Sequence, residues 1–290
     1  MLHELSQSYA EHGYAVSEGL LAPSLLADLQ KVTCDLIEQS RGLDKSNSRF
    51  DLEPSHTAHS PMVRRINDPV TAHPLYDELM RSDLLLDVVS VLIGSQIRFQ
   101  GNKLNTKSGG GGSAVEWHQD FAFYPHTNDD LLAVGIAIDD ATVDNGCLLV
   151  VPGSHRGPVF DHHSDGIFAG AINPSQAGVE LNQAVPMEVS AGSVSVHHVK
   201  MIHGSAPNRS GRQRRLLLFQ YAAVDAWPIL PLHDMDAFNA AIVRGQPTDQ
   251  FRMTSGPVRI PLPEPESAAS IFEIQQSARR RPLAETSCDY

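Results

Sequence analysis

His118 and Asp120, in the run Trp117-His118-Gln119-Asp120, are the residues whose types and spacing most directly predict chemistry. Another histidine, His203, follows much later in the chain, and Arg214 comes after it. Two imidazoles and one carboxylate on one face of a metal are the ligand set of non-haem Fe(II) oxygenases. An arginine beyond the last ligand could hold a carboxylate co-substrate through a two-pronged contact. The combination therefore predicts metal-dependent chemistry rather than metal storage.

The spacing of these ligands calls for β-structure around them. Residues two apart on a strand project to the same side, so His118 and Asp120 suit a strand edge, and His203 must come from a distant strand folded back. After Gly94, short apolar runs alternate with turn residues, a pattern that predicts strands. The runs occupy residues 97–104, 131–138, 147–151, 193–197 and 216–224, with a strong turn signal at Asp144-Asn145-Gly146.

Apolar residues before Gly94 recur instead at helical spacing. A helix is predicted from Pro23 to near Gly42 and another from a Ser82 cap to Gly94, with a loop over residues 46–59. Helices followed by many short strands predict a mainly β fold with helices. We expect a double-stranded β-helix (a cupin-like jelly roll) with N-terminal helices packed on one sheet. The whole chain, 1–290, is interpreted as one domain: a helical prelude at about 1–94, a jelly-roll core at about 95–225 and a C-terminal extension at about 226–290.

Composition limits the partners. Twenty-two Lys and Arg against 34 Asp and Glu leave a formal charge of -12, which argues against nucleic acid or an anionic membrane as the main partner. No secretory signal and no membrane-spanning run is evident, so a cytoplasmic location is expected. Three scattered cysteines, Cys34, Cys147 and Cys288, are too few for a disulfide scaffold, and Cys147 is expected in the core. The oligomeric state does not follow from the sequence.

Two predicted loops stand out. Residues 108–113 contain four consecutive glycines but lack the ending of a phosphate-binding loop, so they are interpreted as a flexible connector. Residues 156–184 form a long insertion that includes His162 and His163, which we expect to be solvated. Its part from 160 to 184 has little apolar area and is predicted to be a mobile lid.

Four blocks of the sequence together resemble the phytanoyl-CoA dioxygenase family of Fe(II)- and 2-oxoglutarate-dependent oxygenases. They are Trp117-His118-Gln119-Asp120-Phe121; Asp144 to Leu148 running into Val151 to Gly157; Ala191 to His198; and His203-Gly204-Ser205-Ala206-Pro207-Asn208-Arg209-Ser210 with Arg214 and Arg215 after it. Each block alone is weak, but four in the family's order are a specific signal.

The resemblance assigns roles to individual residues. His118, Asp120 and His203 would bind Fe(II), Arg214 would pair with the distal carboxylate of 2-oxoglutarate, and Ser205 would help to hold that carboxylate. Lys103, Asn105 and Lys107 lie where the family supplies further co-substrate contacts, and which of them serves is open. This chain has Ser193 where the family often has an acidic residue, at a position interpreted as a turn. Halogenating relatives lack the carboxylate of Asp120, so the resemblance implies a hydroxylase or another oxidative type.

Several alternatives stay open at these positions. His197 and His198 compete with His203 for the third ligand position, although the residues after His203 favour it. Arg215 neighbours Arg214, and adjacent strand residues point to opposite faces, so only one can enter the space between the sheets. Three further residues are weaker candidates for substrate contact, with core packing as the alternative for the two aromatic ones: Phe121, Phe123 and His198.

The function implied is oxidation, most directly hydroxylation, of a small-molecule substrate, with O2 consumed and succinate and CO2 released. The same cofactor chemistry with desaturation, epoxidation or rearrangement as its outcome is a second hypothesis. A non-enzymatic jelly-roll module that binds metal only structurally is a third. It is disfavoured because three ligands and an arginine without a structural role do not describe a closed site.

Overall fold

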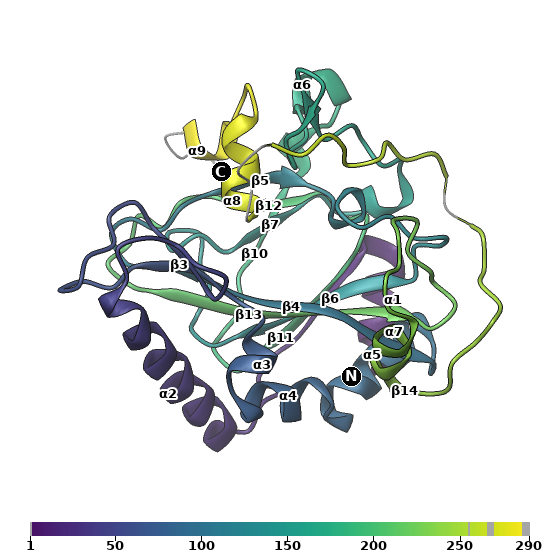
Figure 1. Ribbon diagram of the computed structural model, residues 1–290, viewed down its shortest axis with the longest axis horizontal. Helices are drawn as coiled ribbons and strands as arrows, with labels where there is room; N and C mark the ends of the chain where they lie inside the picture. Colours follow the sequence, from purple (N-terminus) through teal and green to yellow (C-terminus); the bar gives the residue numbers. More distant parts are fainter. Residues whose placement is uncertain (1, 255, 266–269, 286–290) are drawn as a thin grey trace.

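Two antiparallel β-sheets face each other in the computed structural model, and helices cover the outer face of the larger sheet (Figure 1). The structure describes residues 2–254, 256–265 and 270–285, so Cys288 and part of the expected C-terminal extension lie outside the described residues. The larger sheet has the order β1-β11-β6-β13-β4-β3-β2, with β14 paired to β4, and the smaller has the order β10-β7-β12-β5. The sheets do not close into a barrel.

The strands of the larger sheet are β1 (Tyr14–Ser17), β2 (Phe50–Leu52), β3 (Val63–Asn67), β4 (Ile97–Lys107), β6 (Leu131–Ala137), β11 (Val194–His198), β13 (Arg214–Ala223) and β14 (Ile242–Arg244). Those of the smaller sheet are β5 (Val115–His118), β7 (Leu148–Val150), β10 (Val185–Met187) and β12 (His203–Ser205). A separate hairpin joins β8 (His163–Ser164) to β9 (Ile167–Phe168). The five strands predicted from apolar runs are confirmed within a few residues.

The helices are α1 (Leu2–His12), α2 (Pro23–Gln39), α3 (Pro69–Ala72), α4 (Pro74–Met80), α5 (Asp83–Ile93), α6 (Pro174–Ala177), α7 (Met235–Ala240), α8 (Ile271–Ile274) and α9 (Pro282–Glu285). Both predicted N-terminal helices are confirmed. Helix α2 begins with Pro23 at its first turn, and α5 ends at Gly94, whose φ of 91° favours glycine. Ser82 takes the cap position of α5, but its hydroxyl donates to the carbonyl of Leu79 instead of capping. No helix among the described residues is both long and apolar enough to span a bilayer.

The description of residues 1–94 as a helical prelude is wrong in part, because β1, β2 and β3 also lie there. The predicted loop at 46–59 contains β2, a strand of three residues with Phe50 and Leu52 buried. Such a short strand has too few residues for a period-two pattern, and its pairing with β3 rather than local propensity makes it a strand.

Strand β13 shows how one sequence serves two layers. Leu217, Phe219 and Tyr221 belong to the core between the sheet and the N-terminal helices. The alternate residues Arg214, Leu216 and Leu218 line a pocket between the two sheets. Successive side chains of a strand point to opposite faces, so this alternation places the arginine in the pocket while its neighbours hold the sheet against the helices.

Candidate metal and co-substrate site

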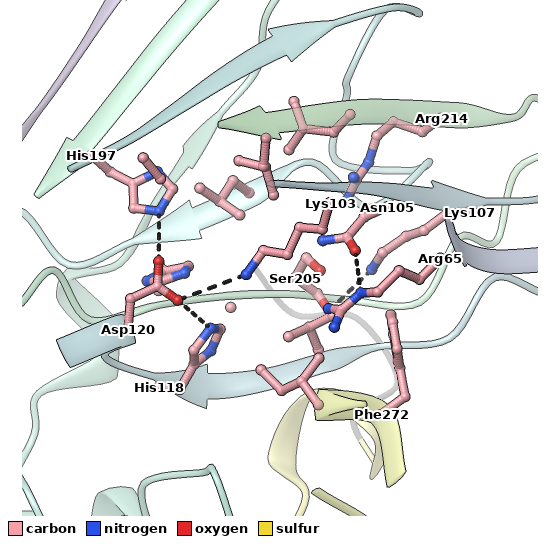
Figure 2. Close-up of a pocket in the computed structure, with 18 residues that line it drawn as sticks. Arg65, Lys103, Asn105, Lys107, His118, Asp120, His197, Ser205, Arg214 and Phe272 are labelled. Carbon is pink, nitrogen blue, oxygen red and sulfur yellow. Dashed lines mark hydrogen bonds and ion pairs between the residues drawn. The ribbon is translucent and has the colours of Figure 1, made fainter. Parts of the chain in front are cut away.

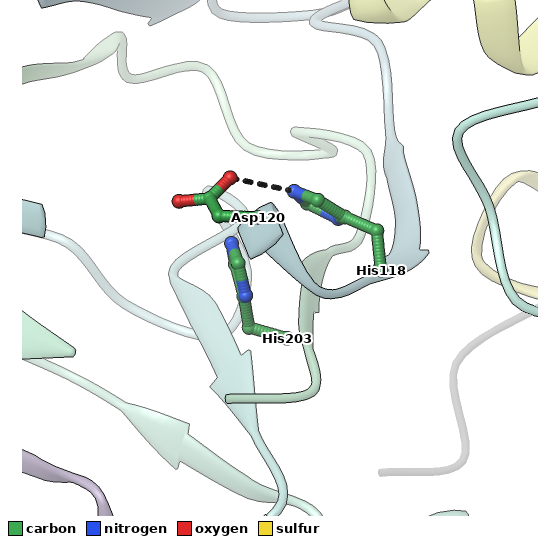
Figure 3. A group of neighbouring side chains, drawn as sticks. All are labelled: His118, Asp120 and His203. Carbon is green, nitrogen blue, oxygen red and sulfur yellow. Dashed lines mark ion pairs between the residues drawn. The ribbon is translucent and has the colours of Figure 1, made fainter. Parts of the chain in front are cut away.

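Strand pairing brings His203 next to His118. His118 ends β5, His203 begins β12, and the two residues are direct partners in the antiparallel register. Asp120 is not on the strand as expected, because β5 ends at His118 and Asp120 begins a 3₁₀ turn, η2 (Asp120–Ala122). The turn nevertheless directs its carboxylate back, so that one ligand atom from each of the three residues lies within 4.8 Å of the others (Figure 3). All three side chains are buried.

Backbone carbonyls orient both imidazoles. The Nδ1 of His118 lies 2.7 Å from the carbonyl oxygen of Glu116, and the Nδ1 of His203 lies 2.9 Å from that of Met201. A carbonyl oxygen only accepts, so each Nδ1 carries the proton and donates, which leaves each Nε2 lone pair free for a metal. Such hydrogen bonds to the outer nitrogen are what ligating histidines ordinarily have.

The protonation states also suit a metal. Burial lowers the pKa of His118 to about 4 and that of His203 well below its usual value. Burial alone would raise the pKa of Asp120, but the charge of Lys103 and the neighbouring histidines hold it well below its usual range. Near neutral pH the cluster therefore presents two neutral imidazoles and one carboxylate, the forms that coordinate divalent iron.

A cationic pocket adjoins the three ligands, between the two sheets (Figure 2). The room left between its side chains is about 30 Å³, space for about two water molecules. Four basic residues line it, Arg65, Lys103, Lys107 and Arg214, and burial lowers the pKa of Lys107 well below its usual value. Asp120 is the one carboxylate among the lining residues that the structure describes. An anionic ligand is therefore the kind that this pocket favours.

Arg214 and Arg215 point to opposite faces of the sheet. Arg214 lines the pocket, where one Nη donates to the carbonyl of Gly146 at 2.6 Å and the buried Nε has no hydrogen-bond partner. Arg215 faces α2 and pairs with Asp139 at 2.7 Å. A buried guanidinium with an orphaned N–H that faces a pocket fits a carboxylate from a ligand.

The other predicted co-substrate residues also line this pocket. Ser205 follows His203 on β12, and Lys107 Nζ donates to the backbone carbonyls of Ser205, at 3.2 Å, and Ala206. Lys103 Nζ lies 3.9 Å from Asp120 Oδ1, and Asn105 Oδ1 accepts a hydrogen bond from Arg65 Nε. Lys103, Asn105 and Lys107 share one face of β4 because they are two residues apart.

The weaker substrate candidates lie outside the pocket. Phe121 is buried in an apolar cluster with Leu131 and Ala222. Phe123 packs its ring against His118, with 5.8 Å between ring centroids, and does not line the pocket. His198 follows His197 on β11 and so faces the opposite way, toward the rings of Tyr9 and His155. Strand alternation is the reason that His197 lines the pocket and His198 does not.

Several pocket residues were not among the predicted site residues, although His197 was an alternative for the third ligand position. His197 Nε2 lies 3.7 Å from Asp120 Oδ2, so it contacts the carboxylate although it is not in the ligand group. Arg65 comes from β3, and Ile271 and Phe272 come from α8 in the C-terminal extension. The sequence offered Arg65, with Arg64 and Arg98, only as a possible partner for an anionic substrate. No motif predicts Ile271 or Phe272 as site residues, because their position depends on where distant segments pack.

The prediction that residues 160–184 form a mobile lid is wrong for the first half of this segment. His162 is buried rather than solvated, and its Nε2 accepts a hydrogen bond from the backbone N–H of Gln119, between the metal ligands. Residues 168–172 are also buried, and Ile172 N–H donates to the carbonyl of Trp117 at 2.8 Å. The first half of the segment is therefore part of the scaffold that supports the ligand strand.

Replacing His162 should change how stability depends on pH. Burial lowers the pKa of His162 to about 3. In the unfolded chain His162 takes up a proton near pH 6.5, whereas in the folded protein it does so only near pH 3. The stability that neutral His162 contributes is therefore complete above about pH 6.5 and is lost as the pH falls toward the folded pKa. In metal-free protein, His162→Asn should flatten the loss of unfolding free energy between pH 7 and about pH 4, by an amount on the order of 3–4 kcal/mol. Urea unfolding at several pH values measures it. The exposed His233 gives the control substitution His233→Asn, and equal slopes in both variants would contradict the prediction.

Three protein ligands beside an open pocket do not make a closed structural metal site. They describe the class of Fe(II) oxygenases with a two-histidine, one-carboxylate centre. The family model for phytanoyl-CoA dioxygenase matches residues 9–216, so the chain belongs to that family. It is a 2-oxoglutarate-dependent dioxygenase with Fe(II) as its cofactor. The hypothesis of a non-enzymatic binding module is therefore wrong.

Two named relatives and one solved structure are similar to this chain. A probable alpha-ketoglutarate-dependent hypophosphite dioxygenase of Stutzerimonas stutzeri is 33% identical over 285 residues, which cover 97% of this chain and 99% of the relative. L-proline trans-4-hydroxylase of Streptomyces griseoviridis is 31% identical over 174 residues, 53% of this chain and 65% of the relative. EctD from S. alaskensis, solved with 2-oxoglutarate and 5-hydroxyectoine, is 24% identical and shares the fold with a TM-score of 0.66 over 88% of this chain and 87% of the other.

Proposed function

We propose that this enzyme hydroxylates a small-molecule substrate. One atom of O2 enters the new carboxylate of succinate as 2-oxoglutarate loses CO2, and the other enters an X–H bond of the substrate to give X–OH. The observation that carries this proposal is Asp120, which occupies the third ligand position beside the pocket. A carboxylate there leaves no room for the chloride that a halogenating centre binds.

Each site residue then has a defined part. His118, Asp120 and His203 would hold Fe(II), which supplies the activation of O2 when bound. Arg214, with Ser205 beside it, would hold the distal carboxylate of 2-oxoglutarate through its free guanidinium N–H groups. His197 would orient the carboxylate of Asp120 from its far side. Residues Ile271 and Phe272 would exclude water from the reacting centre.

The architecture supports two finer structural proposals. Two facing antiparallel sheets whose strands alternate along the chain are typical of a jelly roll, and we interpret the fold as a double-stranded β-helix of the cupin-like type. We also interpret 1–290 as one domain. In support, the pocket draws its lining from both sheets and from α8 near the C-terminus.

The charge of the pocket favours an anionic substrate. The relative that matches nearly the full length carries hypophosphite in its name, and hypophosphite is a small anion. We therefore propose hypophosphite as the first candidate substrate, with phosphite as the product of oxygen insertion into a P–H bond.

Turnover with isotopically labelled O2 tests the proposal. Protein loaded with Fe(II) and 2-oxoglutarate should release more succinate when hypophosphite is added, and phosphorus NMR and mass spectrometry should show phosphite with one labelled oxygen. Glycine and L-proline are comparison compounds. A compound that stimulates succinate release but yields an unlabelled, dehydrogenated or rearranged product would overturn hydroxylation in favour of the second hypothesis. If none of the added compounds changes the rate of succinate release, the choice of small substrates is contradicted.

A further inference from the structure

Arg65 is a buried cation without a carboxylate partner. Its exposed fraction is 8%, and it makes no ion pair within 4.0 Å among the described residues. Burial lowers the pKa of Arg65 to about 10 against the opposing, longer-range charges of Asp51 and Asp120, so the guanidinium stays charged at neutral pH. Burying an unpaired charge is costly, and proteins rarely keep one unless a ligand compensates it.

The other buried arginines do not present an unpaired charge to this pocket, although Arg98 also has no carboxylate partner among the described residues. Arg64, the preceding residue on β3, is equally buried but pairs with Asp51 at 2.8 Å. Arg215 has Asp139, and Arg98 is stacked on the ring of Phe238 at 3.6 Å from its centroid, outside the pocket. The buried arginines that both line this pocket and lack a carboxylate, among the residues described, are Arg65 and Arg214.

The side chain of Arg65 is held in a fixed orientation (Figure 2). Its Nε donates to Asn105 Oδ1 at 2.9 Å, and its guanidinium carbon lies 5.2 Å from the centroid of the Phe272 ring. These two contacts leave both Nη groups without a protein acceptor among the described residues. Two parallel N–H groups from a fixed guanidinium are the geometry that recognises a carboxylate or a phosphorus oxyanion.

Arg65 and Arg214 enter the pocket from strands on opposite sides of β4. Arg65 pairs with Asn105 across β3 and β4, whereas Arg214 pairs with Lys107 on the other side of β4. The two backbones are therefore separated by two strand spacings, about 10 Å. Lys103 lies on the same face of β4 as Asn105 and reaches Asp120, so a second cation stands between Arg65 and the metal ligands.

We propose that Arg65, fixed by Asn105 and assisted by Lys103, binds an oxyanion group of the substrate, while Arg214 holds the co-substrate at a separate position. The enzyme thus selects small substrates that carry a carboxylate or a phosphorus oxyanion. This inference rests on the proposed function in identifying the bound anion as the substrate, whereas the anion site itself is defined by geometry alone. Arg65 is a specificity-determining residue in this assignment.

Anaerobic calorimetry on protein loaded with Fe(II) and 2-oxoglutarate tests the site directly. Hypophosphite, methylphosphonate and acetate are the anionic probes, and acetamide is the neutral counterpart of acetate. At least one anion should bind while acetamide does not, and the better binder distinguishes a phosphorus oxyanion from a carboxylate. Arg65→Met should weaken anion binding by about ten- to a hundredfold, and Arg65→Lys should restore part of it.

The matched control is Arg64→Met. Arg64 contacts the same ring, with its guanidinium carbon 5.1 Å from the Phe272 centroid, but does not line this pocket. The Arg64→Met variant should have reduced thermal stability and an anion affinity within about threefold of the wild-type value. Binding of 2-oxoglutarate to Arg65→Met, measured in parallel, verifies that the variant is folded. If Arg65→Met instead weakens 2-oxoglutarate as Arg214 variants do, Arg65 belongs to the co-substrate site and the inference is wrong.

The outcomes also separate this inference from the proposed function. Arg65-dependent anion binding without any hydroxylated product would retain the anion site and overturn hydroxylation. Hydroxylation of a neutral compound at equal rates by the wild type and by Arg65→Met would retain the function and overturn the anion site.

Discussion

His203→Ala is expected to abolish turnover and to remove most of the affinity for Fe(II), while the fold is retained. The substitution deletes one of three donor atoms that lie within 4.8 Å of one another, and no water ligand reproduces the orientation that the Met201 carbonyl imposes on the imidazole. Anaerobic titration of the metal-free protein with Fe(II), followed by succinate release, measures both effects.

His197→Ala is the matched control, because His197 is also a buried histidine beside Asp120. As a positioning residue it should reduce iron affinity or activity by about ten- to a hundredfold and leave a measurable Fe(II) complex. Full loss of iron binding in His197→Ala, with His203→Ala unaffected, would show that the third ligand had been assigned to the wrong histidine.

Arg214→Met is expected to raise the 2-oxoglutarate requirement by about one to two decades. In the proposed role the guanidinium would provide a charge-assisted contact of about 1.5–3 kcal/mol to the distal carboxylate, and 1.4 kcal/mol corresponds to tenfold. Fe(II) affinity should not change, because Arg214 is not in the ligand group. Initial rates over a range of 2-oxoglutarate concentrations, with hypophosphite or another accepted substrate held constant, give the apparent KM.

Arg215→Met separates this effect from the loss of a buried charge. Arg215 pairs with Asp139 and donates to the Gln30 carbonyl, so its loss leaves a largely buried carboxylate uncompensated. The variant should lose about 3–5 kcal/mol of unfolding free energy and keep an unchanged KM for 2-oxoglutarate. Equal effects of the two substitutions on KM would mean that Arg214 has no special part in co-substrate binding.

Local pattern in the sequence determined much of the scaffold and of the metal cluster. The apolar runs after Gly94 predicted β4, β6, β7, β11 and β13, because burial of one face imposes its period on the residues themselves. His118, Asp120 and His203 could be predicted together because few residue types bind iron and the motif keeps two of them close in sequence. Alternation along a strand was enough to separate Arg214 from Arg215.

Long-range packing decided the rest, and no local pattern encodes it. Asp120 lies in a turn rather than on β5, and His162 is buried against Gln119, because the insertion at 156–184 folds back on the ligand strand. Arg64 and Arg65 are indistinguishable as neighbours in the sequence. Only the positions of Asp51, Asn105 and Phe272, from three separate segments, neutralise one charge and leave the other directed into the pocket. A residue's chemistry is set by its type, but whether its charge is compensated depends on which distant groups the tertiary fold places around it.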